Sequence, residues 1–318
     1  MPLITSLGLS IYALFPLFLP DYAYIGLLIG TVVFSLSAGL SEVLLSPTIA
    51  AIPSKNPQRD MSLLHSLYAF GVFTVVISGT LYVQLVGAEQ WYYLTLFFAA
   101  LPIIAAVLFM LSPIPDMQAN EASLAHPKKK DKKLGVALCV ACIFLGSCAE
   151  NTMSNWISGY MEAELHIDKA LGDLLGVALF AILLGMTRMG YAKWGKSIEK
   201  MLLFGISGAA VCYLVAGIST HVIPAFIACV LTGIFTAMLW PGALILMEEK
   251  MPGLGVAAYA LMAAGGDLGA ALAPQLMGIV ADRAGLQAGM LVTSLFPILG
   301  VIVTVVTIRY FKKKKTEG

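Results

Sequence analysis

The chain has 318 residues, of which 59% are hydrophobic and only 12% are charged, and its formal net charge is +1. Its mean hydropathy is +0.89. Soluble domains carry roughly 45–50% apolar and 25% charged residues, so this composition excludes an ordinary soluble domain.

The apolar residues gather into ten continuous segments. A helix needs about 20 apolar residues to cross the hydrocarbon core of a bilayer. The segments, in chain order, are 3–20, 22–52, 61–87, 91–112, 134–161, 169–190, 201–219, 221–248, 256–281 and 286–308. We therefore predict an all-α polytopic membrane protein with ten transmembrane helices and the lipid bilayer as its surroundings.

The basic residues predict how these helices are oriented. Cytoplasmic loops of membrane proteins are enriched in Lys and Arg. With ten spans, the loops on one side hold all of the 19 basic residues except Lys169 and Arg283. Arg188 is counted with this basic side because it lies close to the end of its span. We expect a multi-pass protein of the cell membrane with both termini in the cytoplasm.

An internal repeat predicts two bundles. A shift of 194 residues lays Gly39 and Pro47 on Gly233 and Pro241, and it lays the helix pair 61–112 on 256–308. Transporters are often built from such repeats. A linker rich in Pro and Lys separates the halves. The predicted parts are an incomplete N-terminal bundle at 1–112, a basic cytoplasmic linker at 113–133, and a six-helix C-terminal bundle with a basic tail at 134–318.

The same shift indicates that the two bundles are unequal. The spans near 134–161 and 169–190 have no partner in the first half, because their counterparts would precede Met1. The expectation is four helices plus six, from a six-plus-six plan without its first two.

Four stretches carry a resemblance to a known family. They are Gly39-Leu-Ser-Glu42-x4-Pro47, Met61-Ser-Leu-Leu-His65-Ser-x4-Gly71, Cys148-Ala-Glu150-Asn-x4-Trp156-Ile-x2-Tyr160 and Gly266-x2-Gly269-x4-Pro274-x3-Gly278-x3-Asp282. In this order they resemble helices four, five, seven and eleven of the fucose/hexose:proton symporter branch of the major facilitator superfamily. The resemblance implies a two-bundle fold with ten of the family's twelve helices, numbers three to six and seven to twelve. It also implies proton-coupled sugar transport.

Two departures from the family pattern concern the site. The Gly/Asp/Arg loop between helices two and three is absent, and so is the helix-one carboxylate that the branch often uses for proton coupling. The corresponding loop of the second half is present in degenerate form, as Gly185-Met-Thr-Arg188-Met-Gly190.

Three carboxyl groups lie within predicted spans, at Glu42, Glu150 and Asp267. An ionisable side chain in a span costs roughly 2.5–3.5 kcal/mol on insertion scales, so it usually faces a cavity or a partner. Glu42 lies near the middle of its span, where a carboxyl that exchanges protons would suit a symporter. A protonated carboxyl bonded to a neighbouring helix is the alternative. Asp267 stands among small residues and could line the cavity or cap a bend.

Glu150 begins a polar cluster that continues with Asn151, Ser154, Asn155 and Trp156. Amide and carboxyl groups can pair with sugar hydroxyls, and an aromatic ring can stack on the apolar face of a sugar. This cluster predicts contact with substrate. Hydrogen bonding between helices and, for Trp156, a place in the interfacial aromatic belt are the alternatives.

Two further residues are candidates. Trp240, next to Pro241, is a candidate for ring stacking on the substrate. His65 lies early in its span, where a structural hydrogen bond and a proton relay are both open.

These features favour a secondary transporter of a small polar solute, a sugar, with a proton as the coupled ion. The sequence has no nucleotide-binding loop and no catalytic triad spacing, so we expect no enzyme, cofactor, metal or nucleic acid. Two alternatives stay open: a truncated, non-transporting remnant of such a carrier, and a ten-helix drug/metabolite-type carrier. The second predicts a boundary after the fifth span, whereas the long basic linker follows the fourth.

Overall fold

The computed structural model describes residues 1–114 and 129–317, and every element in these ranges is helical. The first part contains α1 (Pro2–Phe18), α2 (Ala23–Ala51), α3 (Pro57–Leu85) and α4 (Trp91–Leu111), with the short turns η1 (Pro20–Tyr22) and η2 (Ala88–Gln90). The second contains α5 (Lys129–Ala163), α6 (Lys169–Leu171), η4 (Gly172–Ala178), α7 (Leu179–Trp194), α8 (Ile198–Ile218), α9 (Val222–Thr236), α10 (Leu239–Lys250), α11 (Val256–Ala284), α12 (Leu286–Thr293) and α13 (Leu295–Glu317). Most of the predicted basic linker, 113–133, lies outside the described residues.

The helices match the predicted spans. Within the described ranges, nine helical segments are long and apolar enough to cross a membrane, and α1 is a further apolar helix of 17 residues. Two predicted spans are interrupted. The predicted span 169–190 begins with the single turn α6 and the π-helix η4 before α7, and the predicted span 221–248 is broken between α9 and α10.

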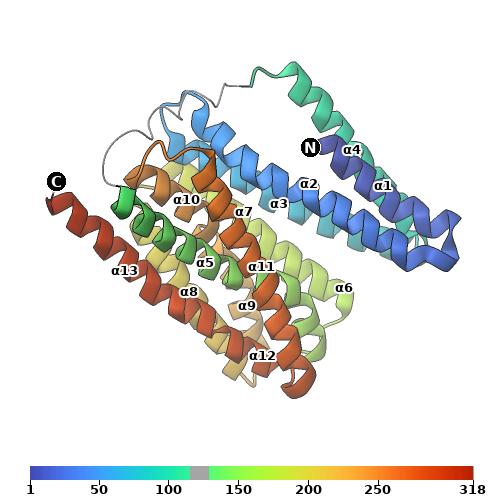
Figure 1. Ribbon diagram of the computed structural model, residues 1–318. Coiled ribbons are helices and arrows are strands. Elements are labelled where there is room, and N and C mark those ends of the chain that lie inside the picture. The colour runs from blue at the N-terminus through green and yellow to red at the C-terminus, as the bar shows by residue number, and fades with distance from the viewer. Residues whose placement is uncertain (115–128, 318) are drawn as a thin grey trace. The chain divides into compact units, whose positions relative to one another are not determined.

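The described residues form two compact units, 1–52 with 78–114 and 53–77 with 129–317. In the first unit α1 packs against both α2 and α4 (Figure 1). The helices α1 and α2 meet through glycines, since a Cβ on Gly30 would lie 2.6 Å from the Tyr12 backbone nitrogen. Thr5 of α1 donates a hydrogen bond to Ser37 of α2, with 2.9 Å between the hydroxyl oxygens.

In the second unit, α5 is the central helix and packs along α11, α13 and α10 (Figure 1). Small residues allow the close contact with α11, because a Cβ on Gly269 would lie 2.4 Å from the Phe144 carbonyl oxygen. Ser147 of α5 donates a 2.7 Å hydrogen bond to the Gly266 carbonyl of α11. Glycine pairs and hydroxyl bonds of this kind hold membrane helices together, since the bilayer provides no hydrophobic force between them.

The first part of α3 belongs to the second unit. Ala69 of α3 is buried, and it packs where Gly185 of α7 has no side chain: a Cβ on Gly185 would lie 3.2 Å from the Ala69 Cβ. That α3 belongs to an N-terminal bundle therefore stays a prediction from the sequence.

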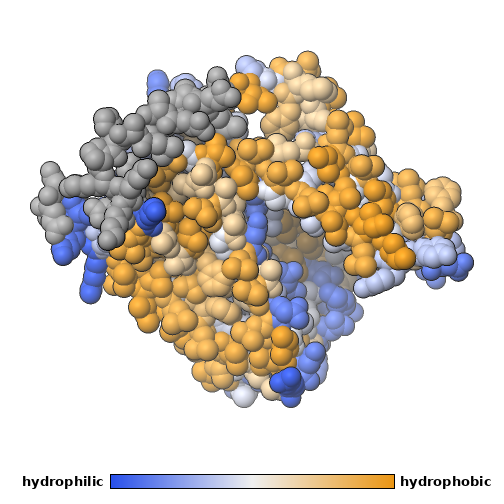
Figure 2. All heavy atoms as spheres, viewed as in Figure 1, coloured by the Kyte–Doolittle hydropathy of each residue, from blue (hydrophilic) through white to orange (hydrophobic). Residues whose placement is uncertain are grey.

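Apolar side chains cover much of the surface in view (Figure 2). Large exposed hydrophobic residues occur on α1, α4, α8, α11 and α13, among others. Soluble proteins rarely expose contiguous apolar surface of this extent, whereas helices in contact with lipid do.

The start of α12 is capped by a residue from a distant part of the chain. Gly285 precedes it with a φ of 88°. One carboxylate oxygen of Glu164, just after α5, accepts hydrogen bonds from the backbone nitrogens of Leu286 and Gln287 at 3.0 and 3.3 Å. A carboxylate here satisfies free N–H groups and complements the positive end of the helix dipole.

We expect Glu164→Ala to lower the stability of the folded protein by about 1 kcal/mol, the usual effect of losing a helix cap. Thermal unfolding in detergent measures this. Glu162→Ala, which removes an exposed carboxyl two residues earlier, is the control and is expected to change little. Equal melting temperatures for the two variants would contradict the capping role.

Candidate functional site

The first feature of the site is a backbone carbonyl that Pro241 leaves without its helical hydrogen bond. In an unbroken helix the N–H of residue 241 would donate to the carbonyl of Ala237, but proline has no N–H to give. The chain leaves α-helical geometry at Ala237 and Met238, between α9 and α10. A carbonyl without its helical partner inside a membrane must find another donor. Arg188 supplies that donor, with 2.7 Å between its Nε and the Ala237 oxygen.

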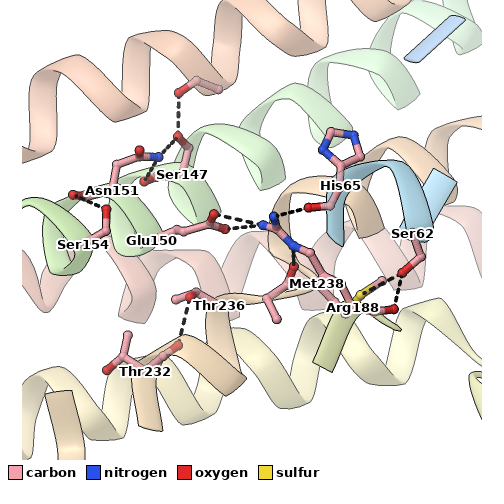
Figure 3. Close-up of polar contacts among 12 residues, drawn as sticks. Ser62, His65, Ser147, Glu150, Asn151, Ser154, Arg188, Thr232, Thr236 and Met238 are labelled. Carbon is pink, nitrogen blue, oxygen red and sulfur yellow. Dashed lines mark hydrogen bonds and ion pairs between the residues drawn. The ribbon is translucent and has the colours of Figure 1, made fainter. Parts of the chain in front are cut away.

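Arg188 lies within α7, and only 1% of it is exposed. Besides the Ala237 carbonyl, its guanidinium contacts two other helices. Its Nη1 donates to the backbone carbonyl of His65 on α3 at 2.9 Å. Its Nη2 lies 2.9 Å from each carboxylate oxygen of Glu150 on α5. Figure 3 shows this side chain at the meeting point of α3, α5, α7 and the break between α9 and α10.

Glu150 is also buried, with 7% of its surface exposed. Two charges are tolerated in such a place only when they are paired and their remaining hydrogen-bonding capacity is met. Arg188 meets this condition through three acceptors on three separate segments. The pair therefore depends on the packing of α3, α5, α7 and α9 together.

A polar strip on α5 continues from Glu150. The Asn151 amide nitrogen donates to the carbonyl and the hydroxyl of Ser147, at 3.2 and 3.0 Å. Ser154 donates to the Asn151 carbonyl at 3.2 Å, as Figure 3 shows. These bonds stay within one helix, so part of the polar capacity of Asn151 and Ser154 is open to another partner.

That strip borders a small cavity of about 40 Å³ between α3, α5 and α7. Its lining residues are Tyr68, Ala69, Val72, Glu150, Asn151, Ser154, Phe180, Ala181 and Leu184. The volume has room for roughly three water molecules, whereas small-molecule sites usually measure about 300–1,000 Å³. The cavity can hold water beside a carboxylate, but it is too small for a sugar.

The structure brings together three of the predicted site residues. Glu150 and Asn151 line the cavity, and the His65 backbone contacts Arg188. Asn155 is exposed one turn further along α5 and donates to the Asn151 carbonyl at 2.7 Å.

The predicted aromatic residues lie in helix contacts of the second unit. The Trp156 indole donates a 3.0 Å bond to the Pro274 carbonyl of α11. The Trp240 ring covers Gly266, where a Cβ would come within 2.3 Å of it.

The other two predicted carboxyl groups lie on α11 and α2. Asp267 is exposed on α11, and Glu42 lies on α2 in the first unit.

Arg188 is the residue that the sequence pattern did not assign to the site. Its position beside Gly190 and Lys193 resembles a loop motif, and counting it with the loop charges was wrong because it is buried within α7. The sequence held two signs that the site needs a buried cation. Pro241 leaves one carbonyl without a donor, and the Glu150 carboxylate needs a positive partner. The sequence alone does not bring those two groups to Arg188.

Among the described residues, no group of three or more His, Cys, Asp or Glu side chains is arranged to hold a metal.

Comparison with known proteins identifies the family. The sequence pattern of the Major Facilitator Superfamily matches residues 139–318, which is more than half of the chain. The chain belongs to the Major Facilitator Superfamily. It is a multi-pass membrane protein of a transporter family, and the drug/metabolite-type alternative is wrong. No curated protein sequence matches the chain.

Solved structures of this superfamily share the fold. A variant of the E. coli fucose:proton symporter FucP superposes with a TM-score of 0.70 at 17% identity, over 96% of this chain and 83% of that one. An outward conformation of FucP gives 0.68 at 16%, over 95% and 82%. The human organic anion transporter MFSD10 gives 0.74 at 15%, over 95% and 76%. Identities this low establish the fold and leave the substrate open.

Proposed function

We propose that this superfamily member is a secondary active transporter that moves a small polar solute, a sugar, together with a proton by alternating access. The observation that carries the proposal is the buried Glu150 carboxylate, which pairs with Arg188 and borders a cavity large enough for water. A carboxyl that can exchange a proton in the membrane, beside an amide and a hydroxyl, is what coupled transport of a polar solute needs.

The proposed roles follow the chemistry of each side chain. Glu42 and Glu150 take up and release the proton. Asn151, Asn155 and the rings of Trp156 and Trp240 contact the sugar once the surrounding helices move apart. Asp267 is proposed to face the sugar once the helices have moved apart, and His65 is proposed as a proton relay. The likeness to the fucose:proton symporter supports this choice of solute and ion, although it extends only to the fold.

The proposed orientation follows the charge pattern. Both termini would lie in the cytoplasm of a cell whose plasma membrane holds the protein, because all of the 19 basic residues except Lys169, Arg283 and the buried Arg188 then face inward. Residues 1–112 and 134–318 are proposed as the two bundles.

The test is sugar uptake into proteoliposomes under an imposed proton gradient. For one proton per solute, about one pH unit supplies about 1.4 kcal/mol and sustains about tenfold accumulation of the sugar. Hexoses and 6-deoxyhexoses are the probes, and an uncoupler should abolish the accumulation. Failure of the folded protein to accumulate any of these sugars would contradict the proposed solute class.

The coupling residues are tested in the same vesicles. Glu42→Gln and Glu150→Gln should each abolish accumulation while sugar exchange at equal pH continues, because the glutamine amide cannot carry the proton. Glu162→Gln, which changes an exposed carboxyl on α5, is the matched control and should accumulate sugar normally. Undiminished accumulation in either variant would remove that residue from the coupling mechanism.

A further inference from the structure

The first part of α3 is fastened to the C-terminal helices by polar bonds that meet at one residue of α7. The Ser62 hydroxyl donates to the Arg188 carbonyl at 2.6 Å, and Arg188 Nη1 donates to the His65 carbonyl at 2.9 Å. Arg188 thus holds α3 through its backbone and its side chain, as Figure 3 shows. Ser62 has no exposed surface, so water does not compete for its bond.

The side chain of Arg188 is aimed at α3 by the partners on its other sides. Nε is bonded to the Ala237 carbonyl and Nη2 to both oxygens of Glu150. The guanidinium is planar, so fixing two of its edges fixes the direction of the third. The Glu150 bonds therefore contribute, with the Ala237 bond, to pointing Arg188 Nη1 at His65.

We propose that Arg188 is a positioning residue that latches residues 57–77 onto the C-terminal helices, and that loss of the charge on Glu150 releases the latch. The inference rests on the proposed function, because it takes the coupled proton bound by Glu150 as the signal that frees α3 from the C-terminal helices. Alternating access moves one bundle against the other, and contacts made by α3 with the C-terminal helices must break in that motion. A neutral Glu150 holds the guanidinium less strongly than a carboxylate does, since charge-assisted bonds are about twice as strong.

Two ionisable residues of α3, His65 and Tyr68, lie next to the pair. From α3, His65 contributes its carbonyl to Arg188, and Tyr68 lines the cavity beside Glu150. The break between α9 and α10 contributes the Ala237 carbonyl, and Met238 there contacts Ser62. The cavity gives water a place next to the Glu150 carboxyl, so a proton can be delivered without unfolding the site.

The experiment measures how often α3 leaves the C-terminal helices. Ser66 of α3 is 2% exposed, and within the described residues its hydroxyl bonds to the Leu63 carbonyl of its own helix, so Ser66→Cys is a mild reporter. The five natural cysteines are buried and serve as internal references. The purified full chain is labelled with a small maleimide, and the modified cysteines are identified by peptide mass spectrometry.

In the Ser66→Cys background, Glu150→Gln should raise labelling at position 66 about tenfold, which corresponds to about 1.4 kcal/mol. Labelling of Cys229, fully buried on α9, should stay unchanged. Ser62→Ala should also raise labelling at position 66, by a smaller factor, because it removes one α3 bond and leaves the ion pair intact. Glu162→Gln should have no effect.

Unchanged labelling at position 66 in folded Glu150→Gln would overturn the latch. An equal rise at Cys229 would also overturn it, because the pair would then support the whole bundle and not α3 alone. Neither measurement uses a sugar or a proton gradient. A failed uptake experiment would therefore contradict the proposed function and leave the labelling result to judge the latch separately.

Discussion

Arg188→Met is expected to lower the free energy of unfolding by about 3–5 kcal/mol, the usual effect of removing one partner of a buried ion pair. The substitution leaves the buried Glu150 carboxylate and the Ala237 and His65 carbonyls without the donor they now share. Methionine fills a similar volume, so loss of packing contributes little. The apparent melting temperature in detergent should fall by roughly 10 °C.

A double variant separates the charge effect from the backbone effect. Glu150→Gln combined with Arg188→Met removes the unpaired charge, so it should recover part of the lost stability but not all, because the Arg188 bonds to the two carbonyls are still missing. Lys200→Met removes an exposed positive charge from α8 and should change stability by less than about 0.5 kcal/mol. If Arg188→Met had the same melting temperature as Lys200→Met, the buried pair would have no structural importance.

Gly269→Ala is expected to destabilise the protein by about 1–3 kcal/mol, because the contact between α5 and α11 has no room for a methyl group. The added Cβ would lie 2.4 Å from the Phe144 carbonyl oxygen. That oxygen belongs to the backbone, so no side-chain rotation relieves the clash and the helices must separate. The Ser147 bond to the Gly266 carbonyl, at 2.7 Å, would lengthen with them.

Gly159→Ala on α5 is the matched control. Nothing lies within 4 Å of a Cβ built there, so the substitution should be neutral or stabilise the helix by roughly 0.5–1 kcal/mol. Thermal unfolding of both variants in the same detergent checks the opposite signs. A Gly269→Ala protein as stable as the unsubstituted chain would show that α5 and α11 do not pack this closely.

The helices could be predicted from the sequence because a membrane span is a local property. A run of about 20 apolar residues must be helical in the bilayer, whatever it packs against. The predicted segment 256–281 and the observed helix Val256–Ala284 agree on this ground. The breaks inside two spans were not predicted. Pro241 marks one of them, but proline also occurs inside unbroken helices such as α11, which contains Pro274.

The polar residues of the site could be predicted only as candidates. Glu150 was identifiable because an acidic group within a span needs a reason to be there. Its partner was not, since Arg188 is 38 positions away and stands in a stretch that resembles a loop motif. Trp156 and Trp240 were identifiable as aromatic groups, but their helix contacts depend on glycines of α11, at positions 278 and 266.

By itself, the sequence determined that this is a helical membrane protein, and its motifs indicated the superfamily. Both follow from the composition and order of single segments. Only the tertiary structure decided that Arg188 joins Glu150, His65 and Ala237, and that the first part of α3 packs on the C-terminal helices. The physical reason is that a buried charge is stabilised by groups from several helices at once, and their meeting depends on packing that no single segment encodes.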